Sequence, residues 1–128
     1  MHHRFTFKAE DKLKSRKLIQ DLFKAGKSFS IFPFRIIYLQ PETGHSYLQA
    51  GFSVSSRNFK KAVERNRIKR LMREAYRLQK SILETELGQT QSYLAVFIIY
   101  TGKVLPEFED ISVKMGETLN RLAKIILK

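Results

Sequence analysis

Residues 60–83 read KKAVERNRIKRLMREAYRLQKSIL, and they hold the clearest helical pattern in the chain. On a helical wheel, five apolar side chains gather within about 100° of one another, which predicts one face against a hydrophobic core. These side chains are Ile68, Leu71, Met72, Ala75 and Ile82. The stretch therefore predicts one long amphipathic helix over residues 60–83.

The opposite face of this helix is basic. Its members recur every three or four residues and are Asn66, Arg70, Arg73 and Arg77, with Lys69 beside them. Surface helices usually mix charges, because like charges one turn apart cost roughly 0.2–0.5 kcal/mol. The planar guanidinium of Arg suits phosphate oxygens and stacks on unpaired bases. The pattern predicts an RNA-binding surface, and a solvated charged face is the alternative.

The positive charge of the chain is concentrated in the same region. The 128 residues include 24 Lys or Arg and 12 Asp or Glu, which gives a net charge of +12. Residues 57–80 alone hold ten Lys or Arg and two Glu, a net charge of +8. Such a charge favours a polyanionic partner, with nucleic acid first and an anionic membrane surface second.

The composition also excludes several classes of protein. There is no Cys, which excludes disulfide bonds and thiolate zinc sites. The longest apolar run, residues 94–100, is too short to cross a bilayer. Residues 1–14 lack the apolar core of a signal peptide and are expected to form an extended or mobile tail. The sequence predicts a cytoplasmic protein with a single domain over residues 1–128.

Three stretches outside the long helix predict strands. Residues 93–100 read YLAVFIIY and are apolar on both faces, which predicts a central strand. Residues 47–55 predict another strand by alternation. Residues 28–40 are interrupted by Pro33, which predicts an edge strand or bend and then a strand over residues 34–40.

Two further helices complete the pattern. Residues 15–25 predict a short helix that Ser15 caps and Gly26 ends. Pro106 is expected to open a last helix with an acidic first turn. The core side of that helix is expected to comprise Phe108, Ile111, Met115, Leu119, Leu122 and Ile126. Together the elements predict an α+β fold, a two-layer α/β sandwich in which helices pack on one mixed sheet.

Apolar and aromatic side chains of the first helix and of one strand face are suited to line a groove for single-stranded RNA. Alternation places Phe34, Ile36 and Tyr38 on one face of their strand, and Ile19 and Phe23 share a face of the first helix. Aromatic side chains in a basic groove bind single strands by stacking. The predicted lining is Phe23, Tyr38, Ile19 and Phe34. Membership of the hydrophobic core is the alternative, and for Ile19, Phe34 and Ile36 it is the better explanation.

Residues 62–74, AVERNRIKRLMRE, closely resemble the RNR motif of bacterial ribonuclease P proteins. The resemblance runs through AV, RNR, KR and RE at unbroken spacing. Residues 22–26 (LFKAG) and 51–55 (GFSVS) resemble the flanking elements of that family, and the element order fits over about residues 12–127. Lys60 stands where the family often has glycine.

The resemblance implies a protein subunit of ribonuclease P, which removes the 5′ leader of precursor tRNA. It implies that a catalytic RNA carries the active site and that the protein binds this RNA and the leader. It also implies the order αβββαβα with a left-handed crossover, as in domain 2 of ribosomal protein S5. The implied RNA-binding residues on the motif helix and its loop are Arg57, Lys60, Lys61, Arg65, Asn66, Arg67, Lys69, Arg70, Arg73 and Arg77.

Three alternatives are open: a ribosomal or other structural RNA-binding protein, a self-sufficient endonuclease, and a DNA-binding helix protein. The sequence has no Gly-rich phosphate loop and no convergent set of acids, so no catalytic residue is predicted. No cofactor is expected on the protein alone, and magnesium is expected only in the RNA-containing holoenzyme. The expected partners are the catalytic RNA and precursor tRNA, with no DNA and no membrane.

Overall fold

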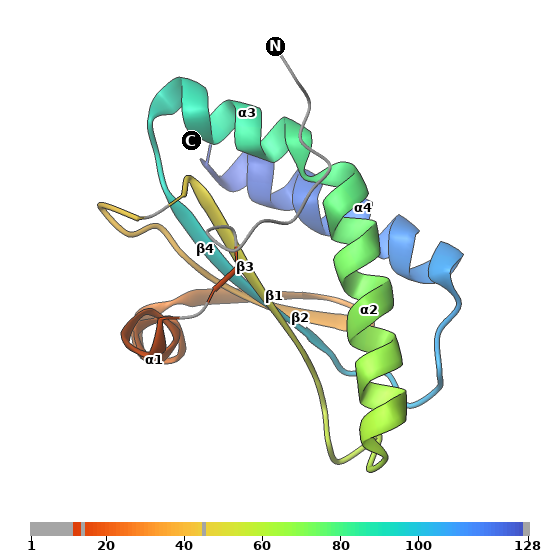
Figure 1. The fold of residues 1–128 in the computed structure, drawn as a ribbon. Coiled ribbons are helices and arrows are strands. Elements are labelled where there is room, and N and C mark those ends of the chain that lie inside the picture. The colour runs from red at the N-terminus through yellow and green to blue at the C-terminus, as the bar shows by residue number, and fades with distance from the viewer. Residues whose placement is uncertain (1–11, 14, 45, 127–128) are drawn as a thin grey trace.

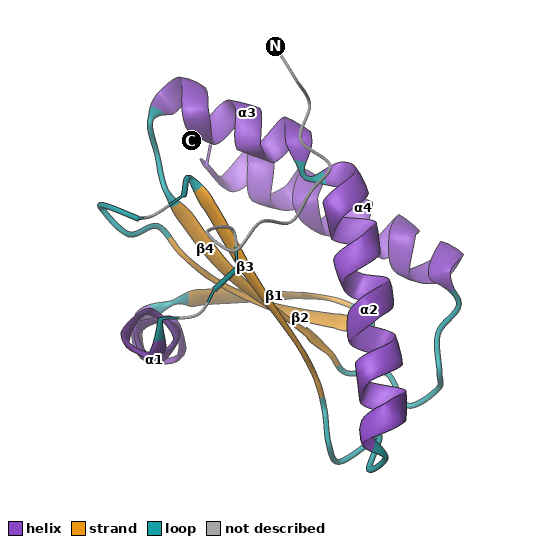
Figure 2. Cartoon of the chain, in the orientation of Figure 1, coloured by secondary structure: helices purple, strands orange, loops and turns teal. Residues whose placement is uncertain are grey.

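The computed structural model describes residues 12–13, 15–44 and 46–126, which form one mixed sheet with helices packed on it (Figures 1 and 2). The predicted mobile tail, residues 1–14, lies outside the described residues except for 12–13. The elements are α1 (Arg16–Ala25), β1 (Lys27–Ile31), β2 (Phe34–Leu39), β3 (Leu48–Val54), α2 (Ala62–Gln79), α3 (Ser81–Thr90), β4 (Leu94–Tyr100) and α4 (Phe108–Ile126). This arrangement confirms the predicted α+β class.

The sheet has the strand order β1-β2-β4-β3. Strand β4 is antiparallel to β2 on one side and parallel to β3 on the other, which confirms the central strand predicted from YLAVFIIY. The connection between the parallel strands β3 and β4 runs through α2 and α3. The handedness of this crossover stays a prediction.

Different helices cover the two faces of the sheet (Figure 1). Helices α2, α3 and α4 bury the face that we call the main-core face, and α1 packs over β2 and β4 on the face that we call the α1 face. Because side chains alternate along a strand, the even-numbered residues of β2, β3 and β4 point to the main core. The odd-numbered residues point to the α1 face, where the smaller core comprises Leu13, Leu22, Ile37 and Ala95.

Helix α1 is capped at its start and ended by the residues that the sequence predicted. The Ser15 side-chain oxygen accepts a hydrogen bond from the backbone N–H of Leu18 at 3.2 Å, and this caps the helix. Helix α1 ends at Gly26, where a Cβ would clash with the carbonyl oxygen of Leu22 and lie 3.0 Å from that of Tyr38. Glycine therefore allows the chain to pass directly from α1 into β1 against the neighbouring strand.

The prediction of a single helix over residues 60–83 is wrong at both ends. Helix α2 begins at Ala62 and ends at Gln79, and α3 runs from Ser81 to Thr90. The bend falls at Lys80, whose buried side chain donates from Nζ to Oε1 of Glu84 at 2.8 Å. A helical wheel assumes one straight axis, so the bend removes Ile82 from the predicted core stripe and leaves it 66% exposed.

The remaining elements follow their predictions closely. Strand β1 is the predicted edge strand, and a turn at Phe32 and Pro33, joined by a cis peptide bond, leads into β2. The last helix begins two residues after Pro106, at Phe108. Its predicted core side is confirmed, since the four central members are buried and the two end members pack against the same core.

Candidate nucleic-acid interface

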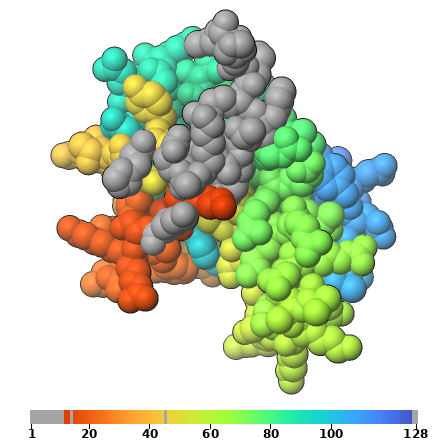
Figure 3. Space-filling model, in the orientation of Figure 1, coloured from red at the N-terminus to blue at the C-terminus, as the bar shows by residue number. Residues whose placement is uncertain are grey.

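Helix α2 separates its apolar and basic side chains onto different faces. Its buried side comprises Ile68, Met72, Ala75 and Tyr76. Among the residues predicted to bind RNA, the exposed ones are Arg57, Lys60, Lys61, Asn66, Arg67, Arg70 and Arg73. The half-buried ones are Arg65, Lys69 and Arg77. Figure 3 shows the N-terminal half of α2, in yellow-green, projecting from the body of the molecule. A large polyanion can reach this surface.

Arg65 has a structural role that the sequence did not reveal. Its Nη1 donates to the carbonyl oxygens of Phe59 and Lys60, each at 2.8 Å. Phe59 itself is buried in the main core, so Arg65 fastens the β3–α2 loop to the first turns of α2. The guanidinium carries five N–H donors, so the remaining ones are still available to a phosphate.

The row of cations on α2 ends in an ion pair. Nε and Nη2 of Arg77 donate to the two carboxylate oxygens of Glu74 at 2.9 and 2.8 Å. This hydrogen bonding lowers the pKa of Glu74 and raises the pKa of Arg77. The charges are therefore not all alike along the helix, and Arg77 is already engaged by a carboxylate.

The α1 face contains an open strip of sheet that α1 does not cover. The paired positions Ser30, Arg35, Ile99 and Ser53 form a row across the four strands, one row beyond the row of Ile37 and Phe97. Arg35 and Ser30 are exposed, and Ile99 and Ser53 are half-buried. The sheet thus presents a floor that is partly apolar and partly basic.

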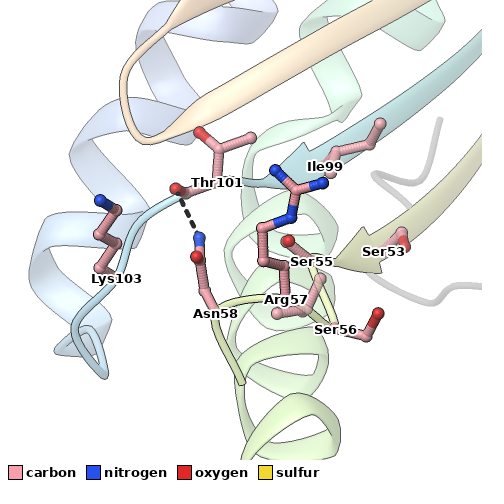
Figure 4. A pocket seen from close by; sticks show the side chains of 9 residues that line it. Ser53, Ser55, Ser56, Arg57, Asn58, Ile99, Thr101 and Lys103 are labelled. Atoms are coloured by element: carbon pink, nitrogen blue, oxygen red, sulfur yellow. Dashed lines mark hydrogen bonds between the residues drawn. The ribbon is translucent and has the colours of Figure 1, made fainter. Parts of the chain in front are cut away.

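A hollow of about 730 Å³ adjoins this strip at the end of the sheet (Figure 4). Its lining comprises Ser53, Val54, Ser55, Ser56, Arg57, Asn58, Ile99, Thr101 and Lys103. These residues supply hydroxyl groups, one side-chain amide and two cations, and none of them carries a carboxylate. The hollow is chemically suited to a phosphate backbone.

The hollow is held open by a small set of hydrogen bonds between loops. Nδ2 of Asn58 donates to the carbonyl oxygens of Thr101 and Gly102, each at 3.2 Å (Figure 4). The Tyr100 hydroxyl donates to the carbonyl of Val104 at 2.8 Å. Burial, and secondly the charge of Asp110, raise the pKa of Tyr100, so this donor keeps its proton. These hydrogen bonds therefore hold the loops after β3 and β4 together.

Aromatic side chains border the strip on the side of α1. The ring of Phe23, 56% exposed, meets the ring of Phe97 edge-on with 5.6 Å between centroids. Ile19 is half-buried against the smaller core on the same face. We call the surface formed by Phe23, Phe97, Arg35, Ile99 and the hollow the α1-face groove.

Two of the four residues predicted for the groove lie elsewhere, so the predicted lining was wrong in part. Phe34 is 1% exposed in the main core, and Tyr38 packs against that core with its ring 5.9 Å from the ring of Phe29. Both are even-numbered residues of β2 and point away from α1. Phe23 and Ile19 lie on the α1 face, as the prediction required.

The sequence reasoning missed Phe97, Ile99, Arg35 and Lys103. One signal was available, because Arg35 shares a strand face with Ile37 and Leu39. A charged residue on an otherwise apolar strand face indicates that part of that face reaches solvent. Phe97 carried no such signal, because both faces of its strand are apolar.

Within residues 12–13, 15–44 and 46–126, no group of three or more His, Cys, Asp or Glu is placed to hold a metal ion. Over the same part of the chain, no helix has the length and apolar character needed to cross a membrane.

The chain is similar to proteins of one known family. The family model described as Ribonuclease P matches residues 7–123. The chain is 36% identical over 120 residues to the ribonuclease P protein component of Porphyromonas gingivalis, covering 93% of this chain and 88% of that protein. It is 32% identical over 121 residues to that of Chlorobium phaeobacteroides, covering 86% and 83%.

Solved structures show the same fold. The ribonuclease P protein of Staphylococcus aureus aligns with a TM-score of 0.69 at 24% identity, over 91% of this chain and 97% of that one. The protein from Thermotoga maritima aligns with a TM-score of 0.66 at 24% identity, over 86% and 96%. The family model spans most of the chain, and both of these relatives exceed 30% identity over more than four fifths of it, so the chain belongs to the ribonuclease P protein family.

Proposed function

We propose that this chain holds two RNAs at once, the catalytic RNA on α2 and the single-stranded 5′ leader of precursor tRNA in the α1-face groove. As a family member, the chain is a protein subunit of ribonuclease P and acts in tRNA 5′ maturation. One observation supports the assignment of both RNAs to this chain. The loop from Ser55 to Lys61 joins both surfaces, because Arg57 lines the hollow while Lys60 and Lys61 lead into α2.

The exposed side of α2 supports the first contact. Arg67, Arg70 and Arg73 are exposed and form no ion pair with another described residue, so they can contact phosphates without first losing a partner. Binding of several phosphates releases counterions, which makes the affinity strongly dependent on salt. The catalytic RNA is the RNA that a ribonuclease P subunit must recognise.

The α1-face groove supports the second contact. Stacking on aromatic rings binds single strands without requiring a particular sequence, and nearby cations follow the backbone. Phe23 and Phe97 provide the rings, and Arg35, Arg57 and Lys103 provide the cations. A leader is the single-stranded part of precursor tRNA, so this groove distinguishes precursor from mature tRNA.

The division of labour in the holoenzyme follows from the same proposal. We assign the chemistry and its magnesium ions to the catalytic RNA, and to this chain the binding and positioning of the substrate. A cytoplasmic location stays a prediction of the sequence.

Reconstitution with the cognate catalytic RNA tests the proposal. The chain alone should leave precursor tRNA intact, and the reconstituted enzyme should cleave it at lower magnesium than the RNA alone. Competition with ribosomal RNA fragments and duplex DNA tests the alternatives. Equal affinity for those competitors, or cleavage by the repurified protein without RNA, would overturn the proposal.

A further inference from the structure

Phe32 is an aromatic residue that the fold leaves in solvent. It lies in the two-residue turn between β1 and β2, and 74% of its surface is exposed. An exposed ring forgoes about 1.5–3 kcal/mol of stabilisation that full burial of such a side chain provides. Folding of the described chain therefore gives no reason for an aromatic residue at this position.

The turn that carries Phe32 is firmly attached to the groove. The carbonyl oxygen of Pro33 accepts two hydrogen bonds from Thr101, one from its backbone N–H at 2.8 Å and one from its Oγ1 at 3.0 Å. Thr101 also accepts from Asn58, and both residues line the hollow. Figure 4 shows the hairpin passing beside Thr101 at the edge of that hollow. The ring is presented from an ordered loop rather than a free one, so binding need order little further chain.

The charge around this turn is positive. Arg35 lies two residues after the turn and is exposed, and Arg57 and Lys103 line the adjoining hollow. An aromatic ring beside cations is the chemistry that binds unpaired nucleotides, in which the base stacks and the phosphates pair with the cations. The turn that carries Phe32 therefore lies beside the hollow, at the end of the groove where a bound strand of RNA would leave it.

We infer that the Phe32 ring is a stacking platform for an unpaired RNA base at the end of the α1-face groove. The base comes from the 5′ leader or from an unpaired segment of the catalytic RNA, because the two share the same chemistry. This inference rests on the proposed function, and it adds a contact that neither the α2 surface nor the Phe23 side of the groove supplies.

The chain has no Trp, so one substitution provides a direct probe. Phe32→Trp introduces a single indole whose fluorescence falls when a base stacks on it. The matched control is Ile82→Trp, which places an indole at a site that is 66% exposed on α3, in the layer across the sheet. Each protein is titrated with precursor tRNA, mature tRNA, catalytic RNA and anionic phospholipid vesicles.

We expect precursor tRNA or catalytic RNA to quench the indole of Phe32→Trp and to leave that of Ile82→Trp unchanged. Quenching by precursor but not mature tRNA assigns the base to the leader, and quenching by catalytic RNA assigns it to that RNA. Phe32→Ala should weaken binding of the same RNA roughly five- to a hundredfold, and Phe32→Tyr should restore it. Unchanged melting temperatures of these variants show that the loss of RNA affinity does not come from unfolding.

Three results overturn the inference. If Phe32→Trp binds RNA with full affinity but its indole is not quenched, Phe32 is not part of the interface, and the proposed function still stands. A response to vesicles alone assigns the ring to a membrane surface instead. If the unaltered chain binds neither precursor tRNA nor catalytic RNA, the proposed function fails, and the inference fails with it.

Discussion

The ring of Phe97 lies against the backbone of Gly51 on the neighbouring strand. A Cβ at position 51 would lie 2.8 Å from Cδ1 and 3.0 Å from Cε1 of Phe97, which is closer than carbon atoms approach without displacement. The same ring also meets the ring of Phe23 on α1 in a T-shaped arrangement. Glycine in the middle of β3 thus makes room for the ring on the floor of the α1-face groove.

Gly51→Ala is expected to disturb the groove. The added methyl group must displace Phe97, and overpacking of this kind costs about 1–3 kcal/mol of the free energy of unfolding. Because Phe97 supports the ring of Phe23, the affinity for precursor tRNA should fall more than the affinity for mature tRNA. Melting temperature and both affinities are measured together. An unchanged ratio of the two affinities would remove Phe97 from the leader contact.

Phe23→Ala and Tyr38→Ala separate the two faces of the sheet. Phe23 is mostly exposed, so its loss should leave stability nearly unchanged and weaken precursor tRNA binding roughly five- to a hundredfold. Tyr38 packs beside Phe29 on the main-core face, so its loss should lower stability by about 1–3 kcal/mol and affect both tRNAs equally. Binding of precursor and mature tRNA is compared with chemical denaturation of each variant. The opposite pattern would show that the leader contacts the main-core face.

Arg70→Ala and Arg73→Ala test the outer side of α2. Both side chains are exposed, so the melting temperature should hold while the affinity for catalytic RNA falls. Each lost phosphate contact should also flatten the salt dependence, with the logarithmic slope changing by about 0.7–0.9. Lys114→Ala on α4, whose side chain pairs with Glu117, is the control with the same change in charge. An equal loss from Lys114→Ala would indicate only a general effect of net charge.

Arg65→Ala should behave differently from its neighbours on α2. Removing the guanidinium leaves the carbonyl groups of Phe59 and Lys60 without their donor, which costs about 1–3 kcal/mol of stability. The loop that carries Arg57 should then lose order, so affinity for catalytic RNA and for the leader should fall together. Thermal unfolding and the two affinities are the measurements. Loss of affinity at full stability would make Arg65 a simple RNA contact.

Glu74→Gln should strengthen RNA binding at low salt. The substitution removes the carboxylate that pairs with Arg77, and with it one negative charge from the basic side of α2. The hydrogen bond to Arg77 lowers the pKa of Glu74. The stability that the ion pair contributes is therefore fully present above the ordinary carboxyl pKa, and it is lost as the pH falls through the lowered pKa. Affinity measured at several salt concentrations near neutral pH should rise most at the lowest salt. A decrease would show that the ion pair positions Arg77 for RNA.

Much of this protein is determined by local sequence. The cap at Ser15, the stop at Gly26 and the apolar strand YLAVFIIY were predicted correctly, because each depends on neighbours along the chain. The RNR motif of α2 identified the family, and the exposed cations of α2 lie where the helical period placed them.

The groove was decided by tertiary structure. Alternation along β2 separates Tyr38 from Ile37, but it does not say which of the two faces α1 will cover. That choice depends on which face the large core under α2 and α4 occupies. The bend at Lys80 was likewise not revealed by periodicity. Gly51 and Phe97 are 46 residues apart and meet only because β3 and β4 pair in parallel. Contacts between distant strands depend on packing of the whole chain, so the sequence supplied the basic helix that we propose binds RNA, and the fold supplied the groove.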